Sequence, residues 1–178
     1  MALHTFQKGL DLPLPGKPTK VVRGSSPCSR VALLADDYPG MKPGMAVAEG
    51  DVVKRGQLLF EDRKQPGVRH TAPGAGRVIG IHRGEKRALQ SIVIDLSDGE
   101  RRGAPGDDEF AVFESFSGAN PDALGRDAIR ALLVESGLWT ALRQRPFGPV
   151  PSPEQDADAL FITAMDSHPH APLPEVAL

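Results

Sequence analysis

Three side chains near the C-terminal end have the types and spacing of a metal site. Asp166, His168 and His170 follow an apolar run, and an Asp-x-His-x-His loop offers one carboxylate and two imidazoles. This spacing is weakly specific, and Pro169 and Pro172 indicate an extended, exposed segment. We therefore interpret these residues as part of a solvated loop and predict no metal ligands in this chain.

Two further features lack the context that their chemistry needs. Cys28 is the single cysteine, and no identifiable base accompanies it, so we interpret it as a loop or strand-edge thiol. The glycines of residues 74–80 are spaced almost like a dinucleotide loop, but they follow a turn and lead into β-branched residues. A phosphate site of that kind needs a strand, a loop and then a helix. The sequence therefore predicts a corner of a sheet there, and neither a catalytic residue nor a cofactor-binding residue in the chain.

Basic residues are concentrated in the middle of the chain, although the chain as a whole is slightly acidic. It has 21 basic and 23 acidic residues and a formal charge of -2, so bulk charge does not indicate nucleic-acid binding. The concentrated basic residues are Arg63, Lys64, Arg69, His70, Arg77, His82, Arg83, Lys86 and Arg87. If they gather at one end of a folded sheet, they form a docking surface for an acidic partner or for anionic headgroups; the alternative is an ordinary solvated face.

The elements that must position these residues are short strands. Glycine (19) and proline (17) are abundant, and 40% of the 178 residues are hydrophobic, which favours a packed core with many turns. Residues 31–35 predict a buried strand, and residues 45–96 have a hydrophobic period near two. The longest apolar runs are about five residues, against the roughly twenty of a membrane-spanning helix.

The pattern of this β-rich region resembles a biotinyl/lipoyl-type sandwich. Residues 47–59 read V-x-x-G-D-x-V-x-x-G-Q-x-L, and residues 72–78 read A-P-x-x-G-x-V. In such carrier domains a modified lysine occupies the tip of a hairpin, and Lys64 is the residue in that position here. A modifying enzyme recognises a tight, exposed turn, and the return of this hairpin through residues 65–70 is longer than that. This argues against covalent attachment of a cofactor at Lys64.

In the second half of the chain the period-two strand pattern gives way to turns and helical spacing. Residues 97–108 are polar and rich in turns, and we place a domain boundary there. Asn120 and Pro121 predict the start of a helix that Gly137 ends. A second short helix is expected over residues 138–144 and a buried strand over residues 158–164.

The expected fold is α+β, with a biotinyl/lipoyl-like barrel-sandwich domain followed by a small helical segment and the first strand of an α/β domain. We assign residues 1–106 to the barrel-sandwich domain and residues 107–150 to the helical segment. Residues 151–178 would begin the α/β domain. A strand that opens an α/β unit needs more chain than remains, so the sequence is expected to be the N-terminal part of a longer protein.

Several runs together resemble the A subunit of the Na+-translocating NADH:quinone oxidoreductase. They are residues 8–13, 31–34, 59–64, 71–73, 83–87, 90–94, 136–147 and 161–166, and the run around Trp139 is the most specific of them. His168 departs from the family pattern, in which an asparagine-like residue precedes the proline.

The resemblance implies a membrane-extrinsic subunit on the cytoplasmic face of the bacterial inner membrane. The complex as a whole would use NADH, flavin, iron–sulfur centres and ubiquinone, with none of them bound by this segment. Its partners would be the other subunits, above all the quinone-binding membrane subunit, and quinone itself is a further candidate. The partner-docking candidates are Arg63, Lys64, Arg69, Arg83, Lys86, Arg87, Trp139, Arg143 and Arg145.

Two alternative functions remain open from the sequence. One is the barrel-sandwich subunit of a related electron-transport complex linked to ferredoxin, and the other is a lipoyl or biotin carrier module.

Overall fold

The computed structural model describes residues 14–16, 19–21, 24, 26–163, 168 and 170–171. The chain divides into two compact units. Pro27–Asp156 form one unit, and the described residues of the segments on either side of it belong to the other. All helices and strands of the described residues lie in the first unit.

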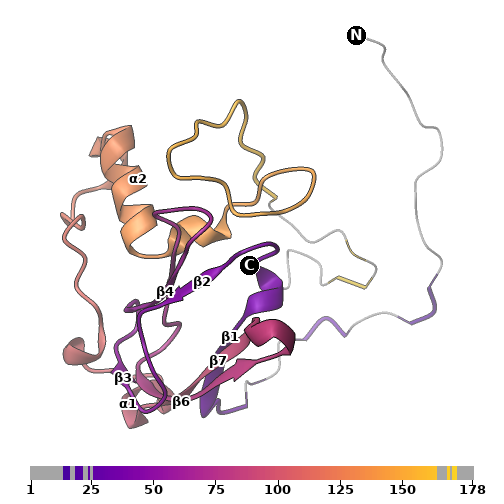
Figure 1. Cartoon of the computed structure of the whole chain (residues 1–178), viewed down its shortest axis with the longest axis vertical. Coiled ribbons are helices and arrows are strands. Elements are labelled where there is room, and N and C mark those ends of the chain that lie inside the picture. The colour runs from indigo at the N-terminus through magenta and orange to yellow at the C-terminus, as the bar shows by residue number, and fades with distance from the viewer. Residues whose placement is uncertain are drawn as a thin grey trace. The chain divides into compact units, whose positions relative to one another are not determined.

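Two antiparallel sheets form the body of this unit (Figure 1). The four-stranded sheet has the order β1 (Arg30–Leu34), β7 (Leu89–Leu96), β6 (Gly76–Arg83) and β3 (Val52–Val53). The three-stranded sheet has the order β2 (Pro43–Met45), β4 (Leu58–Asp62) and β5 (Arg69–Thr71). The β-rich sandwich expected from the period-two pattern is thus confirmed.

The main core lies between the two sheets. Alternate residues of β6 and β7 are buried, because successive side chains of a strand point to opposite faces. The buried members of this cluster are Leu33, Val53, Leu59, Phe60, Ala72, Val78, Leu89, Ile92 and Ile94. Gly76 begins β6 at a point of close backbone approach, where an added Cβ would lie 2.1 Å from the carbonyl oxygen of Asp95.

The prediction of a buried strand over residues 31–35 is wrong in one respect. A strand does form, as β1, but only Leu33 is buried and Leu34 is 49% exposed. The reason is its position at the edge of the sheet, where β7 is its single neighbour. An apolar run identifies a strand without showing whether another strand covers it.

Residues 97–108 contain the short helix α1 (Asp98–Arg101), which packs against the sandwich. Ser97 caps α1 by accepting a hydrogen bond from the Glu100 amide at 3.1 Å. The buried Glu100 carboxylate pairs with Arg55 and also accepts a hydrogen bond from the Ala75 amide at 2.8 Å. The Arg55 hydrogen bond is the main reason that the pKa of Glu100 is lowered.

The helical segment agrees with the predicted caps but not with the predicted length. The side chain of Asn120 accepts a hydrogen bond from the Asp122 amide at 3.0 Å, as expected for a cap. It begins only a 3₁₀ turn, Pro121–Ala123, because the backbone of Leu124 becomes extended. The α-helix, α2, covers Arg126–Glu135, and Gly137 follows its end with φ of 81°.

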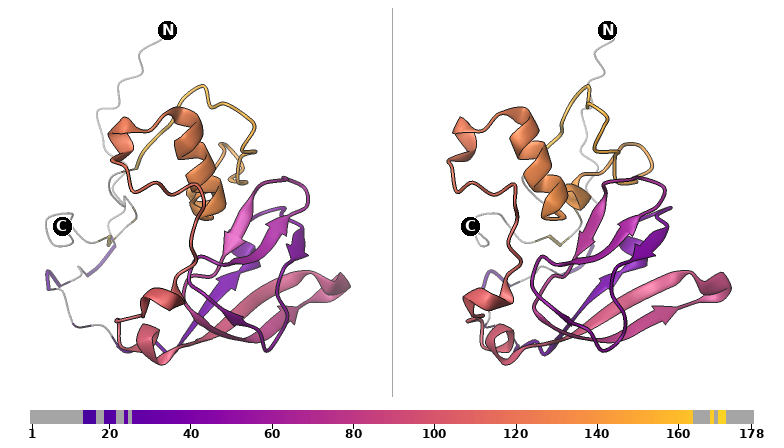
Figure 2. Two further views of the ribbon diagram at one scale, coloured as in Figure 1. Left: turned by 90° about the vertical axis from the view of Figure 1, so that its left-hand side faces the viewer. Right: turned by 60° about the vertical axis from the view of Figure 1, so that its left-hand side comes forward.

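A second, smaller core joins the helical segment to the sandwich, and Figure 2 shows α2 beside the hairpin of β4 and β5. Trp139 lies in the 3₁₀ helix Leu138–Ala141, which is shorter than the helix predicted over residues 138–144. It is 93% buried with Val68 and Val150, and its Nε1 donates to the Pro151 carbonyl at 2.9 Å. Trp139 therefore anchors the helical segment.

The predicted buried strand over residues 158–164 is not present in its described part. Residues 158–163 are in neither a helix nor a strand, and Phe161 and Ile162 are 88% and 83% exposed. An isolated apolar run cannot form a strand without a neighbouring strand to pair with. Ala164 and Asp166 lie outside the described residues, so the proposed Asp166 loop is not described beyond His168 and His170.

Candidate functional site

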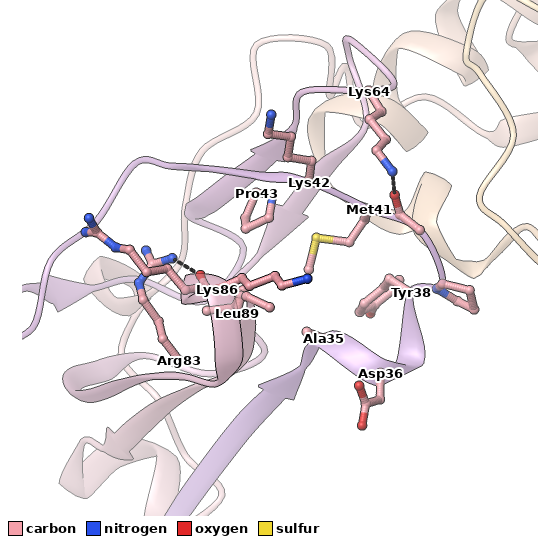
Figure 3. A pocket seen from close by; sticks show the side chains of 14 residues that line it. Ala35, Asp36, Tyr38, Met41, Lys42, Pro43, Lys64, Arg83, Lys86 and Leu89 are labelled. Atoms are coloured by element: carbon pink, nitrogen blue, oxygen red, sulfur yellow. Dashed lines mark hydrogen bonds between the residues drawn. The ribbon is translucent and has the colours of Figure 1, made fainter.

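The first unit carries a groove of about 590 Å³ (Figure 3). Three segments form it: the loop after β1 over residues 35–43, Lys64 in the β4–β5 hairpin, and the β6–β7 turn over residues 83–89. These segments are distant in sequence and are brought together by the pairing of strands within the two sheets.

The groove is strongly basic, unlike the chain as a whole. Its cationic side chains are Lys42, Lys64, Arg83, Lys86 and Arg87, and Asp36 is the one carboxylate among its lining residues. The formal charge of the lining is therefore +4, while that of the whole chain is -2. None of the ion pairs found among the described residues involves any of these five cations.

The β6–β7 turn presents two of these cations in an uncommon backbone conformation. Lys86 and Arg87 have φ of 52° and 61°, the left-handed region that side chains other than glycine seldom adopt. The turn is closed by a hydrogen bond from the Gly84 amide to the Ala88 carbonyl at 2.8 Å. The Arg83 guanidinium donates to the Arg87 carbonyl at 3.1 Å and so stabilises the turn.

The opposite wall is held together by the buried carboxylate of Asp62. Its Oδ1 accepts hydrogen bonds from the amides of Lys42 and Lys64, both at 2.9 Å. The Lys64 ammonium donates to the Gly40 carbonyl at 2.7 Å. Lys64 thus lies against the loop of residues 35–43, which is a different environment from the free hairpin tip of a carrier domain.

Tyr38 connects the groove to the helical segment. Its ring lines the groove, and the Arg143 guanidinium lies 5.0 Å from the ring centroid. Arg143 also donates to the Asp37 carbonyl at 3.1 Å. Arg143 therefore contacts two residues of the loop that lines the groove and does not line the groove itself.

The structure corrects the grouping of His70 with the basic residues. Its ring is 99% buried, stacks on Phe60 at 4.3 Å and meets the edge of Tyr38 at 4.4 Å. Neither ring nitrogen has a hydrogen-bond partner among the described residues. The pKa of His70 is lowered to about 4, mainly by burial and to a smaller extent by Arg143, against the opposing effect of Asp62. The imidazole is therefore a neutral core group at neutral pH.

The remaining candidates are distributed more widely. Arg63 borders a separate, smaller pocket with Pro66, and neither Arg69 nor Arg145 lines the groove. Arg77 lies at the other end of β6 from Arg83 and donates to the Gly50 carbonyl at 2.6 Å.

Four of the predicted docking residues share the groove: Lys64, Arg83, Lys86 and Arg87. Sequence reasoning missed Lys42, whose only signal was its place in the turn between Pro39 and Pro43.

Two other kinds of feature are absent from the described part of the chain. Among the described residues, no helix is both long and apolar enough to cross a membrane. Within the same residues, no three His, Cys, Asp or Glu side chains are grouped so that they would hold a metal ion.

The two sheets and the hairpins that join them define a barrel-sandwich hybrid domain. The family model of the NqrA N-terminal barrel-sandwich hybrid domain matches residues 4–97, and that of the NqrA second alpha/beta domain matches residues 124–178. The chain belongs to the NqrA family. This confirms the resemblance drawn from the runs around Trp139 and along the sandwich.

Curated relatives agree with this assignment. The chain is 48% identical over 174 residues to the A subunit of the Na(+)-translocating NADH-quinone reductase of Haemophilus influenzae (strain PittEE). It is 48% identical to the A subunit of Vibrio parahaemolyticus and 45% identical to that of Vibrio anguillarum, again over 174 residues. Each alignment covers 98% of this chain but 37% of the relative, so the chain spans little more than a third of the length of the relatives it matches.

Proposed function

We propose that this chain is part of the membrane-extrinsic A subunit of a respiratory sodium pump, which couples NADH oxidation and quinone reduction to Na+ export. The names of relatives that share 45–48% of its residues support this proposal. The protein lies on the cytoplasmic face of the bacterial inner membrane. Its partners are the other subunits of the pump, especially the quinone-binding membrane subunit.

The role proposed for this segment is docking and support of the quinone site, with no redox centre of its own. NADH, flavin, iron–sulfur centres and ubiquinone are assigned to the complex as a whole. The observation that carries the docking role is the groove with its five cationic side chains and one carboxylate. A concave, charged surface of this volume can select a partner by electrostatic complementarity.

For the domain organisation we keep the boundaries proposed from the sequence: residues 1–106, 107–150 and 151–178. The match of an alpha/beta domain model to residues 124–178 is consistent with a change of domain in the second half of the chain, although that match begins before residue 151.

Co-purification tests the proposal. The chain, in its full-length context, is tagged in a bacterium that contains the sodium pump, and membranes are solubilised gently. We expect a complex that oxidises NADH in a sodium-stimulated manner to elute with it. A tagged chain that never associates with such a complex, although folded, would contradict the proposal.

A further inference from the structure

We infer that the groove binds an acidic peptide segment of a partner protein, and that this segment inserts an apolar side chain between its cationic walls. The inference rests on the proposed function, since it specifies the chemistry of the partner at the same site. It follows from the charge, the floor and the shape of the groove.

The positive charge of the groove is not balanced within the described part of the chain. Its lysines and arginines are exposed and form no ion pair there, and Asp36 is a single carboxylate against five cations. Elsewhere on the first unit, exposed arginines are commonly paired with acids, as Arg30 and Arg101 both are with Asp95. Concentrated, unpaired positive charge on an acidic chain favours an anionic partner.

The floor of the groove is apolar. Tyr38, Met41 and Leu89 line it together with prolines and alanines, and Figure 3 shows the Lys86 ammonium extending toward Met41 across this floor. A purely ionic ligand would leave this apolar surface in contact with water. An apolar side chain of the partner would cover this surface and remove it from water, which favours binding.

The turn that carries Lys86 and Arg87 supports a binding role. Two consecutive residues other than glycine adopt the left-handed conformation there, which is energetically unfavourable for residues that carry a Cβ. Such a conformation commonly marks functional sites, because it places side chains that a relaxed turn would direct elsewhere.

The arrangement of the cations favours an extended peptide over a compact anion or a membrane. Lys64 and Lys86 belong to different walls, and Figure 3 shows the Lys42 ammonium pointing away from both of theirs. A compact anion needs cations that converge on one point, and a bilayer needs cations on a flat or convex surface. An extended chain places successive side chains on opposite sides. Its acidic side chains can therefore contact both walls of the groove while an apolar side chain contacts the floor.

The test is direct binding of a synthetic probe. The full 178-residue chain is titrated with a fluorescein-labelled peptide containing Glu-Glu-Phe-Glu-Glu, and fluorescence anisotropy is recorded. We expect saturable binding that weakens with salt, and at least about tenfold weaker binding for Lys86→Glu with Arg87→Glu. Peptides with Gln-Gln-Phe-Gln-Gln or Glu-Glu-Gly-Glu-Glu are each expected to bind more weakly than the probe.

A matched control separates the groove from net charge. Lys54 and Arg102 are exposed cations outside the groove, and Lys54→Glu with Arg102→Glu changes the charge of the chain by the same amount. This control is expected to bind the probe like the parent chain. A second groove variant, Lys86→Asn with Arg87→Asn, removes the charge with a residue that tolerates the left-handed conformation, so that a folding defect cannot imitate a loss of binding.

Several results would overturn the inference. They are equal losses in the groove and control variants, equal binding of the glutamine peptide, displacement of the probe by inorganic pyrophosphate, and binding to phosphatidylglycerol-containing vesicles without binding to the peptide. If the parent chain still co-purifies with the pump in any of these cases, the proposed function stands and the acidic peptide is the part that fails. If the probe binds but the chain does not co-purify, the proposed function is the part that fails.

Discussion

At the residue scale, the structure separates side chains of the same type by their surroundings. His70 and Arg69 are adjacent on β5, yet the imidazole is enclosed by Phe60 and Tyr38 while the arginine is half-exposed. This imidazole has no hydrogen-bond partner among the described residues. Burial in such surroundings therefore favours its neutral form over its protonated form.

This environment predicts a pH-dependent stability. The pKa of His70 is about 4 in the folded chain and about 6.5 when unfolded, so between these values the unfolded chain binds the proton more tightly. The free energy of unfolding is therefore highest, as far as His70 is concerned, above a pH of about 6.5. It falls by up to about 3 kcal/mol as the pH decreases toward 4. Urea unfolding between neutral pH and pH of about 4 measures it.

His70→Phe is the matched variant for this prediction. It keeps an aromatic ring between Phe60 and Tyr38 but cannot be protonated, so its stability should fall less over the same pH range. The carboxylates Glu100 and Glu135, whose pKa values are lowered, lose stabilisation below their ordinary pKa in both chains. The same slope in both chains would show that His70 is not the titrating group.

Trp139 provides a second prediction at this scale. Trp139→Ala removes the largest side chain of the smaller core and the hydrogen bond to the Pro151 carbonyl, which should cost about 3–5 kcal/mol. Trp139→Phe keeps more of the packing and should cost less. An unchanged urea midpoint for Trp139→Ala would indicate that the indole is not buried in solution.

At the element scale, the close approach of β6 to β7 makes Gly76 a sensitive position. A Cβ there would lie 2.1 Å from the Asp95 carbonyl oxygen, and neither backbone can move without disturbing the pairing of the two longest strands. We expect Gly76→Ala to destabilise the chain by at least about 2 kcal/mol. Gly24→Ala is the control, because its Cβ meets nothing within 4 Å. Equal unfolding midpoints in the two variants would contradict this.

The loop over residues 35–43 gives a second prediction at this scale. Arg143 holds this loop by its hydrogen bond to the Asp37 carbonyl and its contact with the Tyr38 ring. In Arg143→Ala, the amides of Tyr38 and Met41 should exchange their hydrogens roughly tenfold faster, because their hydrogen bonds to Ala35 and Tyr38 open more often. Arg145→Ala should leave both rates unchanged, and equal acceleration in both variants would show that Arg143 has no special role.

At the scale of the whole molecule, both cores lie inside the unit Pro27–Asp156. A chain restricted to these residues should therefore unfold cooperatively at about the same urea concentration as the full chain. Near-ultraviolet circular dichroism of Trp139 provides a second probe of its packing. Loss of cooperative unfolding in the shorter chain would show that residues outside this unit complete a core.

The sequence by itself determined the features that depend on neighbouring residues. The period of two, the cap at Asn120 and the end of a helix at Gly137 follow from local sterics and local hydrogen bonds. The barrel-sandwich class and the family were also readable, because the turns and the run around Trp139 occur at specific spacings.

Only the tertiary structure decided which residues meet. Lys42 joins Lys64 and Lys86 in one groove, Arg77 lies at the far end of its strand, and His70 is enclosed by aromatic rings. These outcomes depend on which strands pair and in which register, and that is set by contacts between segments far apart in the chain. Charge along a sequence can therefore indicate a basic surface, but the surface itself is formed by the packing of the sheets.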